Sequence, residues 1–220
     1  GFDPALLDDP EARPRLVFGD WVGGDRDGHP FVSAETTRET LTAFRGEALA
    51  LVRRHLAELA ANSSLSGLYQ DTPAAFESWI ESRAAALGEA GRLAVERNPD
   101  EPFRQAVNLM GAALPAETGP AGEAHYADAA PLRADLLRLR EALLAVGAGR
   151  LAATDLDPVL RLVESFGFHL AVLDVRQNSA FHDRALTRLL AAAGEPDSDS
   201  FADWPVDRRT ALLAREVANP

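Results

Sequence analysis

The sequence predicts a mainly α-helical fold, a helical bundle that also contains a few short β-strands. Apolar residues recur at helical spacing through most of the 220 residues, and Gly, Pro and Asn interrupt this pattern where helices are expected to end. Two stretches differ, because they are rich in Val, Phe, Trp and Leu and are punctuated by glycine: residues 15–22 and 167–177. We therefore expect two strands among several helices.

Helical periodicity is clearest in residues 33–60 and 132–146. Ser33 or Thr36 is expected to cap the first helix, and Thr36 with Glu39 has capping-box spacing. One face of this helix is predicted to be buried: Leu41, Phe44, Ala48, Leu51, Val52, His55 and Leu59. A glycine pair just after residue 146 predicts where the second helix ends. This helix places five apolar residues on one face: Leu132, Leu136, Leu139, Leu143 and Val146.

The chain is interpreted as a single partial domain over residues 1–220. It divides into a strand–loop–helix, a helical insert, a second strand–loop–helix and a C-terminal helix: 15–60, 72–166, 167–193 and 203–218. Further helices are expected inside the insert at 73–90, 101–114 and 157–166, whereas the Pro-, Gly- and Ala-rich stretch 115–131 predicts a loop. In barrels built from strand–loop–helix units, catalytic residues follow the strands, so the two loops are the first candidate sites.

Composition and charge restrict the possible functions. Hydrophobic residues make up 46% and charged residues 25%, which is typical of a soluble globular protein. The net charge of −12 argues against nucleic acid and membrane partners, and an anionic substrate would need local arginines. No stretch is apolar for long enough to span a membrane, and the acidic start is no signal peptide. The absence of cysteine excludes disulfides and thiolate chemistry and fits a reducing compartment.

The segment GGDRDGHP, residues 23–30, is the first candidate site. It is not an EF-hand, because counting from Asp25 the glycine falls at position 4 and Thr36 stands at position 12. No phosphate-binding P-loop motif occurs in the chain. Two readings stay open: a tight turn in which Arg26 pairs with neighbouring aspartates, or a functional loop whose glycines fix its backbone. His29 is the one histidine kept as a site neighbour.

Arg176 is the second candidate. Alternation in residues 168–177 places Asp174 and Arg176 on the same face of the predicted strand. A guanidinium at the end of an apolar strand needs a partner. Two partners are equally consistent with the periodicity. One is Asp174, and the other is the phosphate or carboxylate of a bound ligand.

These two segments resemble one known family. GDWVGGDRDGHPFVSAETT (19–37) resembles the hallmark segment of bacterial-type phosphoenolpyruvate carboxylase, G-S-W-x-G-G-D-R-D-G-N-P-x-V-T. FGFHLAVLDVRQNSAFHDRAL (166–186) is similar to the family segment F-G-x-x-L-x-x-L-D-x-R-Q-x-S, and NPDEPFR and YADAAPLRADLLRLREAL agree more weakly. Three positions depart from the family's Ser, Asn and Thr: Asp20, His29 and Ser33.

The resemblance implies a lyase that converts phosphoenolpyruvate and bicarbonate to oxaloacetate and phosphate, an anaplerotic carbon dioxide fixation. It implies Mg²⁺ or Mn²⁺ in the parent enzyme, a cytoplasmic homotetramer, and strands that belong to the parent's α/β barrel. Arg176 matches a catalytic arginine at the substrate phosphate, and Arg26 matches a substrate-binding arginine of the same cleft. The expected supports of the loop are Gly23, Gly24, Asp25, Asp27, Gly28, His29, Asp174 and Gln177; no residue is expected to bind metal.

The resemblance also implies that parts of the enzyme lie outside these residues. The catalytic histidine is expected upstream, and the lysine, metal-binding carboxylates and glycine- and arginine-rich loop are expected downstream. We therefore expect an internal fragment, either expressed as such or naturally truncated, with no bound metal and no activity of its own. The alternative is a non-catalytic binding or assembly domain that retains the carboxylase scaffold.

Overall fold

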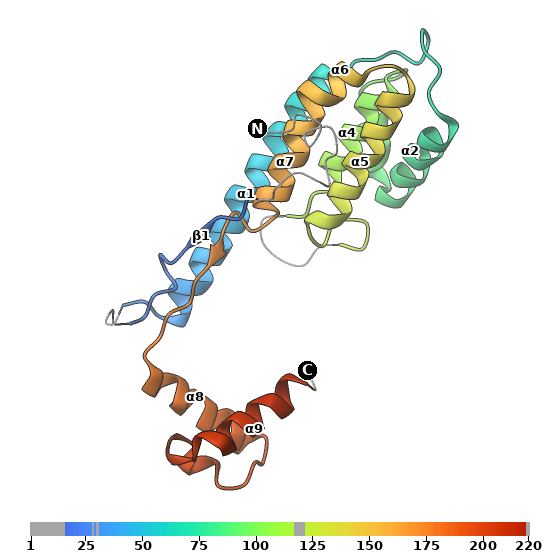
Figure 1. Ribbon diagram of the computed structural model, residues 1–220. Helices are drawn as coiled ribbons and strands as arrows, with labels where there is room; N and C mark the ends of the chain where they lie inside the picture. Colours follow the sequence, from blue (N-terminus) through green and yellow to red (C-terminus); the bar gives the residue numbers. More distant parts are fainter. Residues whose placement is uncertain (1–15, 28, 30, 117–121, 219–220) are drawn as a thin grey trace, which may run out of the picture. The chain divides into compact units, whose positions relative to one another are not determined.

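The computed structural model describes residues 16–27, 29, 31–116 and 122–218 (Figure 1). These residues are mainly helical, which confirms the predicted fold class. They divide between two compact units, a larger one from the described residues of 1–20 and 38–172 and a smaller one from the described residues of 21–37 and 173–220. We describe each unit by itself.

The larger unit is built from helices that the sequence largely predicted. In chain order they are α1 (Ala34–Asn62, whose first residues belong to the smaller unit), α2 (Ala74–Leu87), α3 (Glu89–Glu96), α4 (Pro102–Ala112), α5 (Ala129–Ala145), α6 (Gly149–Leu151), the π-helical turn η2 (Ala152–Leu156) and α7 (Asp157–Phe166).

The predicted helix 73–90 ends earlier than expected, and a separate helix follows it. Gly88 lies between α2 and α3 with φ of 58°, a conformation that favours glycine. Gly91 then allows α3 to approach α2 closely, since a Cβ atom there would lie 2.2 Å from the Ala84 carbonyl oxygen. The chain therefore turns back at Gly88, which the helical spacing of the sequence did not reveal.

The core of the larger unit forms where α1, α4, α5 and α7 bury apolar side chains. All four core leucines predicted for α5 have 0% exposed surface: Leu132, Leu136, Leu139 and Leu143. The predicted face of α1 was partly wrong, because Leu49 and Leu56 are buried while Leu41 is 50% exposed. His55 is half-buried and its Nδ1 lies 3.2 Å from a Glu58 carboxylate oxygen, so it is a boundary histidine.

The two strands form a parallel two-stranded sheet but are much shorter than predicted. β1 is Gly19–Asp20 and β2 is Val172–Leu173, and the Val172 amide donates to the Phe18 carbonyl at 2.8 Å. The residues before β2 are used to end α7: Gly167 has φ of 52°, Leu170 has φ of 64°, and the Leu170 amide donates to Phe166. The alternation predicted for residues 168–177 therefore fails at Leu170.

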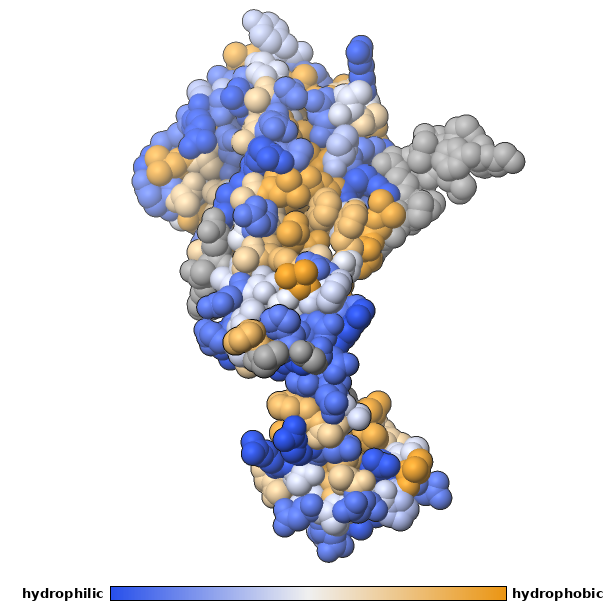
Figure 2. Space-filling model, turned by 90° about the vertical axis from the view of Figure 1, so that its left-hand side faces the viewer, coloured by the Kyte–Doolittle hydropathy of each residue, from blue (hydrophilic) through white to orange (hydrophobic). Residues whose placement is uncertain are grey.

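The smaller unit contains α8 (Ser179–Ala192), the 3₁₀ helix η3 (Ser198–Asp203) and α9 (Val206–Val217). The predicted helix 203–218 begins at residue 206, because Trp204 and Pro205 are extended. A small cluster holds these elements together: Phe201, Trp204, Leu212, Leu186 and Leu190. Figure 2 shows apolar surface on both units. Within the described part of the chain, no helix is long and apolar enough to cross a membrane.

Candidate functional site

The strand–loop site lies in the smaller unit, where the glycine loop and the chain after β2 run side by side. Asp25 and Arg176 form a parallel bridge. The Arg26 amide donates to the Arg176 carbonyl at 2.9 Å, and the Arg176 amide donates to the Gly24 carbonyl at 3.1 Å. Backbone hydrogen bonding therefore brings together the two segments whose arginines the sequence singled out.

Two glycines make this close approach possible. Gly23 has φ of 83°, so a side chain there would be strained. Gly24 is buried, and a Cβ atom at this position would lie 2.3 Å from the Asp174 carbonyl oxygen. The Trp21 carbonyl accepts from the Gly24 and Asp25 amides at 3.0 Å, which closes the turn. The double glycine is therefore a requirement of the pairing.

Arg26 is held by the start of α1 and not by its neighbouring aspartates. Its Nη2 donates to the Thr37 hydroxyl at 2.8 Å, and that hydroxyl also lies 2.8 Å from the Gly23 carbonyl oxygen. Arg26 Nε is buried and has no hydrogen-bond partner among the described residues. The local turn reading, in which Arg26 pairs with Asp25 or Asp27, is not what the structure shows.

Arg176 is exposed and lies over an aromatic ring. Its guanidinium carbon is 5.6 Å from the centre of the Trp21 ring, a cation–π arrangement that leaves the N–H edges of the group accessible. Within the described chain, no ion pair joins Arg176 to Asp174, which is exposed. Arg176 therefore presents hydrogen-bond donors that no carboxylate of the described residues occupies.

The other predicted support residues occupy the same segments. The Asp25 carboxylate accepts from the Asp27 amide at 3.0 Å, which shapes the loop backbone. Gln177 Oε1 accepts from the Asn178 amide at 2.9 Å, and Asn178 in turn caps α8 by accepting from Ala180. His29 stacks edge-on with Phe31, with ring centres 5.9 Å apart. Gly28 lies outside the described residues.

Two side chains of the site received no role from the sequence. Thr37 bonds the Arg26 guanidinium, and Trp21 supports Arg176. Both residues lie inside the first quoted motif, and this was the only feature of the sequence that pointed to them. Their contacts could not be predicted, because they depend on how the loop folds back onto α1 and the strand end.

A metal site is a separate question. Across the residues that the structure describes, no group of three or more His, Asp or Glu side chains comes together to hold a metal ion. The Asp25 carboxylate accepts from the Asp27 amide within the loop, and we assign no metal ligand among the described residues.

The fold and the site define a mainly helical protein in which a double-glycine loop pairs with an arginine-bearing strand end. The sequence model described as Phosphoenolpyruvate carboxylase matches residues 6–220. The chain therefore belongs to the phosphoenolpyruvate carboxylase family, as its two motifs predicted.

Curated relatives named "Phosphoenolpyruvate carboxylase" agree along almost the whole chain. The protein of Nocardia farcinica is 37% identical over 219 residues, covering 94% of this chain and 22% of the relative. That of Azorhizobium caulinodans is 36% identical over 224 residues, covering 96% and 23%. That of Aromatoleum aromaticum is 35% identical over 234 residues, covering 99% and 24%. The chain thus spans less than a quarter of the length of these relatives.

Proposed function

We propose that residues 1–220 are a single partial domain of a phosphoenolpyruvate carboxylase and form part of its site for the substrate phosphate. The pairing of Gly24–Arg26 with Arg176 is the observation that supports this proposal. It brings two guanidinium-bearing residues together on a backbone that glycines hold in one conformation. In this proposal β1 and β2 belong to the α/β barrel of the complete enzyme.

The proposed chemistry uses the donors of the two arginines. Arg176 is the catalytic residue, because its accessible N–H groups bind the phosphate as it leaves phosphoenolpyruvate for bicarbonate. Arg26 binds the substrate from the loop, through guanidinium N–H groups that the Thr37 hydroxyl does not occupy. A planar guanidinium suits phosphate, since it can donate two parallel hydrogen bonds.

The remaining parts of the reaction are assigned to the complete enzyme. We propose that its Mg²⁺ or Mn²⁺ is held by residues other than those described, and we derive no step through the metal. We further propose that the complete enzyme is a cytoplasmic homotetramer. Its product, oxaloacetate, would serve an anaplerotic role. The isolated 220-residue chain is expected to form no oxaloacetate from phosphoenolpyruvate and bicarbonate; measurable formation by the pure chain would contradict this.

A chimera tests the proposal. In it, this chain replaces the matching segment of the Nocardia farcinica carboxylase, and the unsubstituted chimera is expected to be active. Arg176→Gln is expected to lower kcat/KM for phosphoenolpyruvate by about 10²–10³-fold. Arg176→Lys should recover part of this loss, because it restores the charge but not the paired donors. Arg26→Gln should cost about tenfold or more.

Arg188→Gln on α8 is the matched control, because it removes an exposed arginine of the same unit outside the site. Its kcat/KM should equal that of the unsubstituted chimera. The proposal is wrong if Arg176→Gln retains parental kcat/KM. An inactive chimera that folds and binds no phosphoenolpyruvate would favour the non-catalytic alternative.

A further inference from the structure

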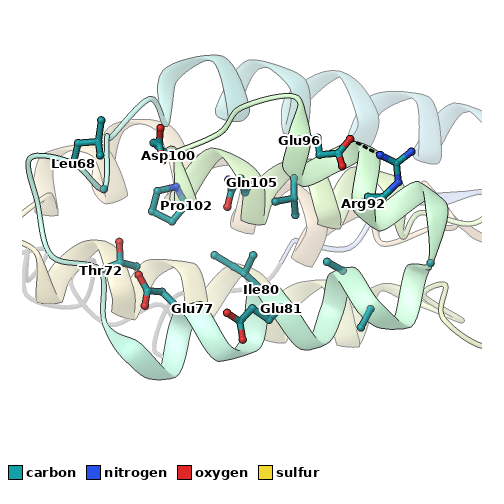
Figure 3. Close-up of a pocket in the computed structure, with 15 residues that line it drawn as sticks. Leu68, Thr72, Glu77, Ile80, Glu81, Arg92, Glu96, Asp100, Pro102 and Gln105 are labelled. Carbon is teal, nitrogen blue, oxygen red and sulfur yellow. Dashed lines mark hydrogen bonds and ion pairs between the residues drawn. The ribbon is translucent and has the colours of Figure 1, made fainter.

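The larger unit contains a groove that uses none of the residues of the strand–loop site. It has a volume of about 850 Å³ and lies between α2 on one side and α3, α4 and the loop near residue 68 on the other (Figure 3). This volume is in the range of small-molecule sites, which are usually apolar with a few placed polar groups.

The floor of the groove is apolar. Ile80 of α2 is 5% exposed and points into the space between the two sides, opposite Pro102 (Figure 3). Ala84 and Val95 continue this surface along the groove. A hydrocarbon chain lying here would therefore lose contact with water without displacing polar groups.

The rim of the groove is acidic on both sides. Glu77 and Glu81 lie one helical turn apart on α2, and Asp100 lies on the facing side (Figure 3). Within the described chain, none of these three carboxylates makes an ion pair or side-chain hydrogen bond. Arg92 does not neutralise them, because it pairs with Glu89 and Glu96. The rim thus has uncompensated negative charge above an apolar floor.

Thr72 adds a polar group to one end of the groove. Its hydroxyl oxygen is buried and has no hydrogen-bond partner among the described residues. In Figure 3 this oxygen is directed toward the space between the two sides. Because this oxygen has almost no accessible surface, a ligand N–H group would satisfy it only if the Thr72 side chain shifts toward the groove.

We propose that this groove binds a linear aliphatic amine, with its methylene groups on the apolar floor and its ammonium groups at the acidic rim. An anion is excluded by the charge of the rim. A bare metal ion does not fit, because the carboxylates do not converge on one point and the floor offers no ligands. The inference does not depend on the proposed carboxylase function.

Hexamethylenediamine is the probe, titrated into the 220-residue chain and followed by calorimetry and by amide chemical shifts. Hexanediol keeps the hydrocarbon chain without charge, and ammonium chloride at equal ionic strength keeps the charge without the chain. Saturable binding is expected for the diamine alone, with shifts concentrated in α2 and around residues 95–105. Binding should weaken as salt is added, because the rim is exposed.

Four variants locate the site. Glu77→Gln and Glu81→Gln are each expected to weaken diamine binding about threefold, and the double variant about tenfold. Ala85→Leu should also weaken it, since an added side chain on the exposed wall narrows the groove without touching the core. Glu141→Gln, an exposed carboxylate of α5 outside the groove, is the control and should leave binding unchanged.

Each other outcome overturns the proposal. It fails if the diamine does not saturate, if ammonium chloride competes as well at equal ionic strength, or if Glu141→Gln weakens binding as much as Glu81→Gln. A lysine-rich peptide that binds at least tenfold more tightly than the diamine would instead assign the groove to a basic protein segment. Carboxylase activity is not a readout here, so this result is separate from the chimera experiment.

Discussion

In the larger unit, the four core leucines of α5 have no exposed surface, whereas in the smaller unit Trp21 and Arg176 of the strand–loop site remain exposed. The leucines are fixed by apolar packing from several helices. The site is fixed by a few backbone hydrogen bonds and by two glycines that permit them. Stability and the proposed binding chemistry therefore rest on separate residues, and each can be changed without the other.

The largest effect is expected when the packed core is broken. Leu139→Ala should lower the free energy of unfolding by about 3 kcal/mol, because Leu139 has no exposed surface and a cavity would remain. Urea denaturation followed by circular dichroism measures this loss. The hydrogen-exchange protection of the Arg176 amide, at the site, should change little under native conditions. A loss below about 1 kcal/mol would mean that the core rearranges freely.

The second effect breaks the site and leaves the core intact. Gly24→Ala should disrupt the pairing with the strand end, since the new methyl group would overlap the Asp174 carbonyl oxygen. We expect the free energy of opening at the Arg176 amide, measured by hydrogen exchange, to fall by about 2 kcal/mol. Gly46→Ala is the control, because a Cβ atom there meets no neighbour. Unchanged protection in Gly24→Ala would show that the loop does not need this close contact.

The third effect concerns a buried polar pair inside the core. Burial, together with the negative charge of Asp135, raises the pKa of Tyr126 well above its ordinary value of 10.0. Its hydroxyl donates to the Asp135 carboxylate at 2.8 Å. Because the folded pKa exceeds the unfolded one, the stabilisation is complete below about pH 10 and is lost as pH rises toward the folded pKa.

Tyr126→Phe should therefore remove part of the alkaline loss of stability and cost about 1 kcal/mol at neutral pH. Urea midpoints measured from neutral to alkaline pH test this expectation. Tyr69→Phe is the control, because the Tyr69 side chain is 92% exposed. If the parent and Tyr126→Phe lose stability identically above pH 10, the burial of this hydroxyl does not have the proposed effect.

The smallest effect is expected at the helix cap beside the site. The Ser33 hydroxyl accepts from the Thr36 amide at 3.2 Å, so Ser33→Ala should cost about 0.5 kcal/mol of local stability. Hydrogen exchange at the Thr36 amide measures it. Ser33→Thr, which restores the hydroxyl found in the family motif, should recover the protection; failure to recover would assign the effect to packing instead of capping.

The sequence predicted the parts that depend on local pattern. The spacing of the α5 leucines identified its buried face, and the two motifs identified both the family and the segments that pair. It failed for α1, whose 29 residues carry apolar side chains on several faces, so its partners decide which of them are buried. It also failed at Leu170, because ending α7 required a left-handed residue that no side-chain pattern announces.

Local patterns and motifs were enough to identify a mainly helical chain of the phosphoenolpyruvate carboxylase family, with a double-glycine loop and two candidate arginines. The folded structure was needed to show that Thr37, and not a neighbouring aspartate, holds Arg26, and that the Trp21 ring lies beneath Arg176. Helical periodicity and glycine preference act over a few residues. The partner of a guanidinium depends on how the chain folds back on itself, over 11 residues for Arg26 and Thr37 and between distant segments for Arg176 and Trp21.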